Sequence, residues 1–307
     1  MEFNELKLKI ENLKKETGAI ILAHYYTRPE VQELADFLGD SLELSRKAAE
    51  TDAETIVFCG VHFMAETAAI LSPQKRVLIP KLRAGCSLAE SITSYEIIKW
   101  KEKNPDGLVV SYVNTTADVK SVTDYCVTSA NAVRIVEKLP ADSKILFLPD
   151  YNLGNYIKKV TGREMEIWDG NCCVHQRITA EMVFAKHQEY PEALVLMHPE
   201  SFCSHDDRIL ESSFVKIAST SGILRDAAAS DCKQFIIATE NETLYKLRKD
   251  NPNKEFIPVD NRTVCGSMKR VTAESIYEAL LNNQYEVKIP QHIQEKAIQP
   301  IKRMLEF

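Results

Sequence analysis

Three cysteines recur along this 307-residue chain at nearly the same interval, because Cys86, Cys172 and Cys265 are separated by 86 and 93 residues. Each cysteine follows a short apolar run and lies in a turn-like stretch with a nearby glycine, where the backbone can approach a ligand closely. Three thiolates that meet at one point could hold a metal or a cluster with one coordination position left free. The spacing therefore indicates one unit repeated three times, with one thiol per unit.

The nature of the metal follows from what surrounds the three cysteines. A closed structural zinc site commonly uses four ligands in paired C-x-x-C spacings, which this sequence lacks. Cysteine thiolates hold iron–sulfur clusters, so the trio predicts a [4Fe–4S] cluster with three cysteine ligands and one open iron that polarises substrate. Cys173 competes with Cys172 for the second position, and register favours Cys172. The other four cysteines are interpreted as structural thiols: Cys59, Cys126, Cys203 and Cys232.

Each repeat also opens with an apolar run followed by two polar residues at offsets 0 and 2. These pairs are His24/Tyr26, Tyr112/Asn114 and His198/Glu200. Histidine, tyrosine and glutamate can carry protons when they face a substrate. His175 follows Cys172 by three residues and is therefore expected beside the cluster.

A hydroxyl-rich stretch precedes a helical pattern in every repeat. Its members are Ser41, Ser129, and Thr220 with Ser221. Such residues commonly cap helices. Where several helix N-termini converge, their free N–H groups and hydroxyls instead suit a phosphate or a carboxylate. The repeat favours an anion-binding role for these hydroxyls.

Strand-like apolar runs alternate with helical patterns, which predicts βαβ units with parallel sheets. We expect an α/β fold of three pseudo-threefold-related, three-layer α/β/α domains with short parallel sheets around a central cavity. The predicted repeats cover residues 1–86, 87–172 and 173–265, and residues 266–307 are expected to form closing helices. Ligands bind beyond the carboxyl ends of parallel strands, so the three polar faces should share one cavity.

The composition excludes several classes of protein. The net charge of −6 and the lack of a basic stripe argue against nucleic-acid binding. No apolar run reaches the roughly 18 residues of a membrane span, and the acidic N-terminal stretch does not resemble a signal peptide. Eight cysteines in such a chain are typical of reduced thiols in the cytosol. We therefore expect a cytoplasmic protein that acts on small molecules.

The chain closely resembles the quinolinate synthase family from about Ala19 to Met268. Together the matching motifs are very specific, although each alone is weak. They are His24-Tyr25-Tyr26, Gly39-Asp40-Ser41, Gly60-Val61-His62-Phe63-Met64-Ala65-Glu66, Gly85-Cys86-Ser87, Tyr112-Val113-Asn114-Thr115-Thr116, Thr128-Ser129-Ala130-Asn131, Asp169-Gly170-Asn171-Cys172-Cys173-Val174-His175, His198-Pro199-Glu200 and Ser219-Thr220-Ser221-Gly222.

The resemblance implies a [4Fe–4S] enzyme that condenses iminoaspartate with dihydroxyacetone phosphate to give quinolinate, phosphate and two waters for NAD biosynthesis. It implies Cys86, Cys172 and Cys265 as cluster ligands and Tyr26, Glu200, His24 and His198 as the catalytic groups. Substrate would contact His24, Ser41, Tyr112, Asn114, Ser129, His175, His198, Glu200 and Thr220. It also suggests a functional link to an L-aspartate oxidase or dehydrogenase that supplies iminoaspartate.

The chain departs from the family pattern at two places. Cys265 is followed by Gly266 and Ser267 where the family often has Pro-Asn, and Ser201 replaces a frequent cysteine after Glu200. Two other classes stay open. One is a diphthamide-synthase-like three-cysteine [4Fe–4S] enzyme on a triplicated fold, against which the His-Tyr-Tyr and His-Pro-Glu runs count. The other is a non-catalytic cluster protein, for which a fourth cysteine ligand would be expected.

Overall fold

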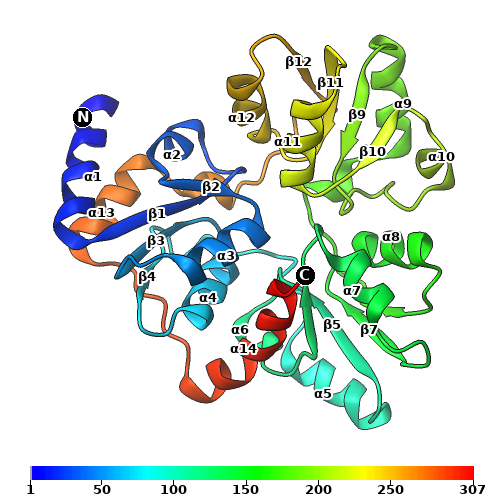
Figure 1. Cartoon of the computed structure of the whole chain (residues 1–307), viewed down its shortest axis with the longest axis horizontal. Helices are drawn as coiled ribbons and strands as arrows, with labels where there is room; N and C mark the ends of the chain where they lie inside the picture. The colour runs from blue at the N-terminus through cyan, green and yellow to red at the C-terminus, as the bar shows by residue number, and fades with distance from the viewer. Residues whose placement is uncertain (1) are drawn as a thin grey trace.

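The computed structural model describes residues 2–307, so only residue 1 of the first predicted repeat lies outside it. The described chain forms three separate four-stranded sheets, all parallel, with strand orders β2-β1-β3-β4, β6-β5-β7-β8 and β10-β9-β11-β12. Figure 1 shows the three α/β units arranged around a common centre. The predicted fold class is confirmed. Each sheet lies within one predicted repeat, although the domain boundaries themselves stay predictions.

The units have closely related element orders. The first contains α1 (Phe3–Thr17), β1 (Ala19–His24), α2 (Pro29–Leu34), β2 (Phe37–Gly39), α3 (Ser41–Glu50), β3 (Thr55–Cys59), α4 (His62–Leu71) and β4 (Arg76–Leu78). The second contains α5 (Ser94–Lys103), β5 (Leu108–Tyr112), α6 (Ala117–Lys120), β6 (Tyr125–Val127), α7 (Ala132–Lys138), β7 (Ile145–Leu148), α8 (Tyr151–Thr161) and β8 (Glu166–Ile167).

The third unit and the C-terminal segment follow. The third unit contains the 3₁₀ turn η1 (His175–Arg177), α9 (Ala180–Glu189), β9 (Leu194–Met197), α10 (Asp207–Leu210), β10 (Val215–Ile217), α11 (Thr220–Ala229), β11 (Gln234–Ala238), α12 (Thr243–Asp250) and β12 (Glu255–Pro258). The C-terminal segment contains η2 (Met268–Arg270), α13 (Ala273–Asn282) and α14 (Gln291–Leu305).

Each unit contains one strand that the apolar runs did not predict. The edge strands β2, β6 and β10 have three residues each, too few for a recognisable pattern. Each ends shortly before the hydroxyl-rich stretch of its unit. The hydroxyls therefore follow a strand end, as the polar pairs do, and lie on the same edge of the sheet.

The hydroxyl residues are not the helix caps. Asp40 caps α3 by accepting the N–H groups of the next turn, and Ser219 caps α11 in the same way. Ser41 and Thr220 are the first residues of these helices, while Ser129 lies two residues before Asn131, which precedes α7. The capping interpretation is thus wrong for the three predicted hydroxyls, and their side chains do not serve as the caps of these helices.

The C-terminal helices pack on the first two units. α13 lies against α1, and α14 packs against α4, α6 and β6. Between them, the Val287 N–H donates to the Val77 carbonyl at 2.9 Å, which extends the edge of the first sheet. In Figure 1, α14 in red lies beside the second unit, close to the centre of the molecule.

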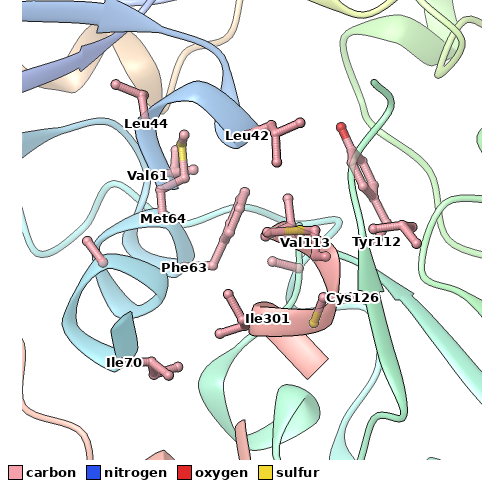
Figure 2. Packing of buried hydrophobic residues seen from close by; sticks show 14 of the residues in the cluster. Leu42, Leu44, Val61, Phe63, Met64, Ile70, Tyr112, Val113, Cys126 and Ile301 are labelled. Carbon is pink, nitrogen blue, oxygen red and sulfur yellow. The ribbon is translucent and has the colours of Figure 1, made fainter. Parts of the chain in front are cut away.

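A buried apolar cluster joins the first two units. Figure 2 shows Leu42 of α3 and Phe63 of α4 close to Val113 and Tyr112, with Ile301 of α14 below them. Burial of such side chains stabilises each by about 1.5–3 kcal/mol relative to exposure. This cluster holds the cavity-facing edges of the two sheets together. No helix within residues 2–307 has the length and apolarity to cross a membrane.

Candidate active site

A single cavity of about 330 Å³ lies where the three units meet. Thirteen of the side chains that the sequence predicts for the site line it, whereas Ser221 does not. The thirteen are His24, Tyr26, Ser41, Cys86, Tyr112, Asn114, Ser129, Cys172, His175, His198, Glu200, Thr220 and Cys265. The cavity thus collects groups that are up to 241 residues apart in the sequence because each follows a strand of its own unit.

The three predicted cysteine ligands share a local geometry. Burial raises the pKa of the Cys86 thiol to about 12 and raises those of Cys172 and Cys265. A neighbouring thiol adds to each shift: Cys265 for Cys86, Cys86 for Cys172, and Cys173 for Cys265. Backbone N–H groups two or three residues further on oppose this by favouring the thiolate. They belong to Leu88 and Ala89, to Val174 and His175, and to Met268.

Cys173 has a different environment from Cys172. The Cys172 sulfur lies 3.3 Å from His175 Nδ1, whereas Cys173 is exposed at the edge of the cavity. This placement supports the choice of Cys172. Of the cysteines interpreted as structural, Cys59, Cys126 and Cys203 are buried, and none of the eight forms a disulfide in the described chain.

Two histidines at matching repeat positions have the same orientation. The Tyr26 N–H donates to His24 Nδ1 at 3.1 Å, and the Glu200 N–H donates to His198 Nδ1 at 3.3 Å. In the neutral rings the proton therefore belongs on Nε2, where His198 meets the Ser129 hydroxyl at 3.2 Å. Burial lowers the pKa of His24 to about 4 and that of His198 to about 3. Both rings are neutral near pH 7.

The Glu200 carboxylate lies close to three other polar side chains of the cavity. Its Oε2 lies 2.8 Å from His175 Nδ1 and 3.5 Å from His198 Nδ1, while Oε1 accepts from Asn114 Nδ2 at 3.3 Å. Burial alone would raise the pKa of Glu200, but His175, His198 and the Tyr112 hydroxyl together hold it below its usual value. Glu200 is thus a buried carboxylate that is ionised at neutral pH.

Tyr26 lies at the other side of the network. Burial and the Glu200 charge raise the pKa of its phenol well above the usual value, so the hydroxyl keeps its proton. The Tyr26 hydroxyl lies 2.8 Å from both Thr220 Oγ1 and Thr239 Oγ1. Thr239 Oγ1 lies 2.9 Å from His175 Nε2. A continuous hydrogen-bonded path therefore links Tyr26 to Glu200 through Thr239 and His175.

Sequence reasoning missed Thr239 and Asp40. Thr239 follows β11 directly and pairs in register with His198 after β9, so its place after a strand end was the available signal. Asp40 uses Oδ1 to cap α3, while its Oδ2 accepts from the Ser221 hydroxyl at 2.5 Å and from the Ser221 N–H at 3.3 Å. Asp40 therefore joins the first turns of α3 and α11 across two units.

The donor set fits a cluster with three cysteine ligands. Cys86, Cys172 and Cys265 line one cavity, and each comes from the loop that follows the last strand of its unit. Adjacent buried thiolates repel one another, so a cationic group between them would stabilise their ionised form. Cys172, His175 and Glu200 also bring ligand atoms within 4.8 Å of one another. In that second group, His175 Nδ1 already contacts both the Cys172 sulfur, at 3.3 Å, and Glu200 Oε2, at 2.8 Å.

Comparison with known proteins gives one consistent result. A family model described as quinolinate synthetase A protein matches residues 8–306. Proteins named quinolinate synthase are 47% identical in Thermus thermophilus (99% of this chain, 98% of the relative) and 47% in Pyrobaculum aerophilum (98% and 99%). The corresponding protein of Aquifex aeolicus is 48% identical (100% and 95%). The chain therefore belongs to the quinolinate synthetase A protein family, a family of enzymes in NAD biosynthesis.

Proposed function

We propose that this enzyme condenses iminoaspartate with dihydroxyacetone phosphate and releases quinolinate, phosphate and two waters. The observation that carries the proposal is the convergence of polar groups from three separate sheets on one cavity. The family membership of nearly the whole chain supports the same reaction. The two alternative classes, a diphthamide-synthase-like enzyme and a non-catalytic cluster protein, draw no support from these relatives.

Hydroxyls and helix N-termini would bind the anionic groups of the substrates. Ser41 and Thr220 are the first residues of α3 and α11, where the positive end of the helix dipole favours anions. Asp40 and Ser219 already accept other N–H groups of these first turns, so the two hydroxyls would supply the hydrogen bonds. Ser129 adds a hydroxyl from the second unit and is oriented by His198 Nε2 at 3.2 Å. Phosphate and carboxylates can thus be held mainly by hydrogen bonds, with Arg270 as a cation at the cavity lining.

Glu200 and Tyr26 would perform the proton transfers. The ionised Glu200 carboxylate can accept a proton from a substrate carbon or nitrogen, and His175 at 2.8 Å would stabilise its charge. Tyr26 keeps its proton in the resting site and can donate it to a leaving oxygen. His24 and His198 present neutral rings whose Nε2–H groups can donate to substrate oxygens, and Tyr112 and Asn114 complete the polar wall.

Cys86, Cys172 and Cys265 would hold a [4Fe–4S] cluster. When bound, a cluster with one iron free of protein ligands supplies a Lewis acid that polarises a substrate oxygen. The protein's part is to present three thiols and the acid–base groups to the same cavity, with His175 and Glu200 next to Cys172. A single metal ion on Cys172, His175 and Glu200 is the competing arrangement, favoured by their spacing within 4.8 Å.

The cellular setting follows from the chemistry proposed. Iminoaspartate has to be formed by oxidation of an amino acid, so an L-aspartate oxidase or dehydrogenase would supply it. Eight unpaired cysteines suit a reducing compartment, and we place the enzyme in the cytoplasm.

Anaerobic purification, metal analysis and a quinolinate assay test the proposal together. We expect about four irons per chain and quinolinate formation that needs both substrates. Cys265→Ala should lose iron and activity. The matched control is Cys173→Ala, which should keep both. One iron or zinc per chain, retained in Cys265→Ala, would favour the competing single-metal arrangement. An iron-replete protein that forms no quinolinate would contradict the reaction.

A further inference from the structure

The three cysteine loops are fastened by the same backbone hydrogen bond. In each unit, the third residue after the end of the third strand (β3, β7 or β11) donates its N–H to the carbonyl two positions before the cysteine. The bonds are His62 to Ala84 at 2.8 Å, Tyr151 to Gly170 at 2.6 Å and Asn241 to Thr263 at 2.9 Å. This recurrence establishes which positions correspond among the units. The residues just before the donors are therefore equivalent: Val61, Asp150 and Glu240.

Two of these equivalent residues are buried carboxylates that contact the cysteines directly. Asp150 Oδ2 accepts the Cys172 N–H at 3.2 Å, and Glu240 Oε1 accepts the Cys265 N–H at 2.9 Å. Both side chains belong to residues that are 0% exposed. In the first unit Val61 takes this place, so no corresponding carboxylate reaches the Cys86 loop from that position.

Both carboxylates use each of their oxygens as an acceptor. Asp150 Oδ1 accepts the Leu153 N–H at 2.8 Å, which caps α8, while Oδ2 serves Cys172. Glu240 Oε2 accepts the Glu242 N–H at 2.8 Å, and Oε1 serves both Cys265 and Lys269, whose Nζ lies 2.6 Å away. An amide in either place would offer one acceptor and turn an NH₂ group toward a backbone donor.

We propose that Asp150 and Glu240 are positioning residues that set the backbone of the second and third cluster ligands, while the first ligand has no carboxylate at the equivalent position, Val61. The inference rests on the proposed function, because it assumes that Cys172 and Cys265 ligate a cluster. Each carboxylate joins the end of a sheet strand to a ligand cysteine, so it transfers the rigidity of the sheet to the thiol. Neither residue touches the sulfur through its side chain, and neither is a catalytic residue.

The test compares Asp150→Asn and Glu240→Gln with the parent and with Asp124→Asn. Asparagine caps helices as well as aspartate does, so Asp150→Asn can keep the α8 cap and lose the cysteine contact. Asp124 is a matched control in the second unit. Its carboxylate accepts the Val109 N–H at 2.8 Å, at the amino end of β5 and away from the cavity.

The measurement is the rate of iron loss to a chelator from the full-length holoprotein under anaerobic conditions, with the electron paramagnetic resonance spectrum of the reduced cluster. We expect Asp150→Asn and Glu240→Gln to lose iron about 10–100-fold faster and to show altered spectra, with Asp124→Asn like the parent. Parent-like loss rates and spectra in both test variants would overturn the inference. A parent that binds no cluster would instead contradict the proposed function.

A second measurement needs no variant and so does not depend on the folding of a mutant. In the parent protein, the Cys172 and Cys265 amides should exchange hydrogen more slowly than the amide of exposed Cys173, because a buried carboxylate accepts each of them. Exchange of all three at the same fast rate would overturn the inference.

Discussion

At the scale of single residues, the site separates groups that hold a proton from groups that accept one. Burial keeps the Tyr26 phenol protonated, while His175 and the Tyr112 hydroxyl hold the pKa of the equally buried Glu200 carboxylate below its usual value. The two side chains face the same cavity from different units. Their opposite protonation at one pH is what an acid–base pair needs.

Removing either proton carrier should reduce turnover more than binding. We expect Tyr26→Phe and Glu200→Gln to lower kcat by about 10²–10⁴-fold, because each keeps its shape but loses the ionisable group. The check is steady-state kinetics on iron-replete variants under anaerobic conditions. Parent-like turnover in both variants would shift the acid–base roles to His24, His175 or His198.

Thr239 should matter for its hydroxyl alone. Thr239→Val keeps the shape but breaks the contacts to Tyr26 and His175 at 2.8 and 2.9 Å, whereas Thr239→Ser keeps the hydroxyl. Two hydrogen bonds that contribute about 0.5–1.5 kcal/mol each sum to about 1–3 kcal/mol, which predicts a loss in kcat of roughly 5–150-fold for valine. Serine should restore most of it, and equal activity in all three proteins would show that the path is not used.

The second cluster ligand can be assigned by a pair of alanine variants. Cys172→Ala should lose iron and visible colour, whereas Cys173→Ala should keep about the parent's iron content, because Cys173 is exposed and lacks the contact to His175. Iron analysis of both anaerobically reconstituted proteins is sufficient. The reverse result would mean that the register argument chose the wrong cysteine.

At the scale of elements, short connections after the strands place the polar groups that line the cavity. The loop after β5 carries Asn114, and its backbone is hydrogen-bonded to Lys120 of α6, which is 0% exposed. The Lys120 amine donates to the Val113 carbonyl at 2.8 Å and to the Thr115 carbonyl, and lies 5.5 Å from the centre of the Phe63 ring. One lysine thus fixes both sides of Asn114.

Lys120→Met should therefore loosen this loop. The Val113 carbonyl would keep the Thr115 N–H as a donor at 2.8 Å, but the buried Thr115 carbonyl would lose Lys120, at a cost of about 1–3 kcal/mol in the free energy of unfolding. We expect a lower denaturation midpoint and a raised KM, because Asn114 would lose its fixed orientation toward Glu200. Lys138→Met, which removes a lysine at the surface of α7, is the control. An unchanged KM together with an unchanged midpoint would contradict this role.

At the scale of the whole molecule, closing three units around one cavity buries ionisable groups. His24 and His198 have pKa values of about 4 and about 3, below the value of about 6.5 in an unfolded chain. Between pH 6.5 and 4 the unfolded state therefore binds protons that the folded state does not. The stability provided by the neutral rings is present above pH 6.5 and is lost as the pH falls.

We expect the denaturation midpoint of the metal-free protein to fall from pH 6.5 to 4.5. A His24→Gln, His198→Gln double variant should show a shallower fall, because its glutamines do not titrate. Nuclear magnetic resonance of the imidazole protons provides a direct check. The double variant identifies the signals of His24 and His198. Titration of these two histidines near pH 6.5 in the folded parent would contradict the predicted burial effect.

Much of this architecture is encoded locally and could be predicted from the sequence. An apolar run followed at once by a polar pair predicts a parallel strand with functional residues at its carboxyl end, and the period of the cysteines indicates three such units. This explains why the thirteen predicted residues line one cavity. The three-residue strands β2, β6 and β10 escaped prediction, whereas the opposite edge strands β4, β8 and β12 lie in the apolar runs that precede the cysteines.

Only the tertiary structure decided which groups meet across units. Thr239 lies 213 residues from Tyr26, and Asp40 lies 181 residues from Ser221, so no local sequence pattern predicts either contact. The same holds for Asp150 and Glu240, whose buried oxygens find cysteine N–H groups 22 and 25 residues away. Strand ends follow from short-range patterns of burial, whereas hydrogen-bond partners and proton positions depend on how the three sheets pack around the cavity.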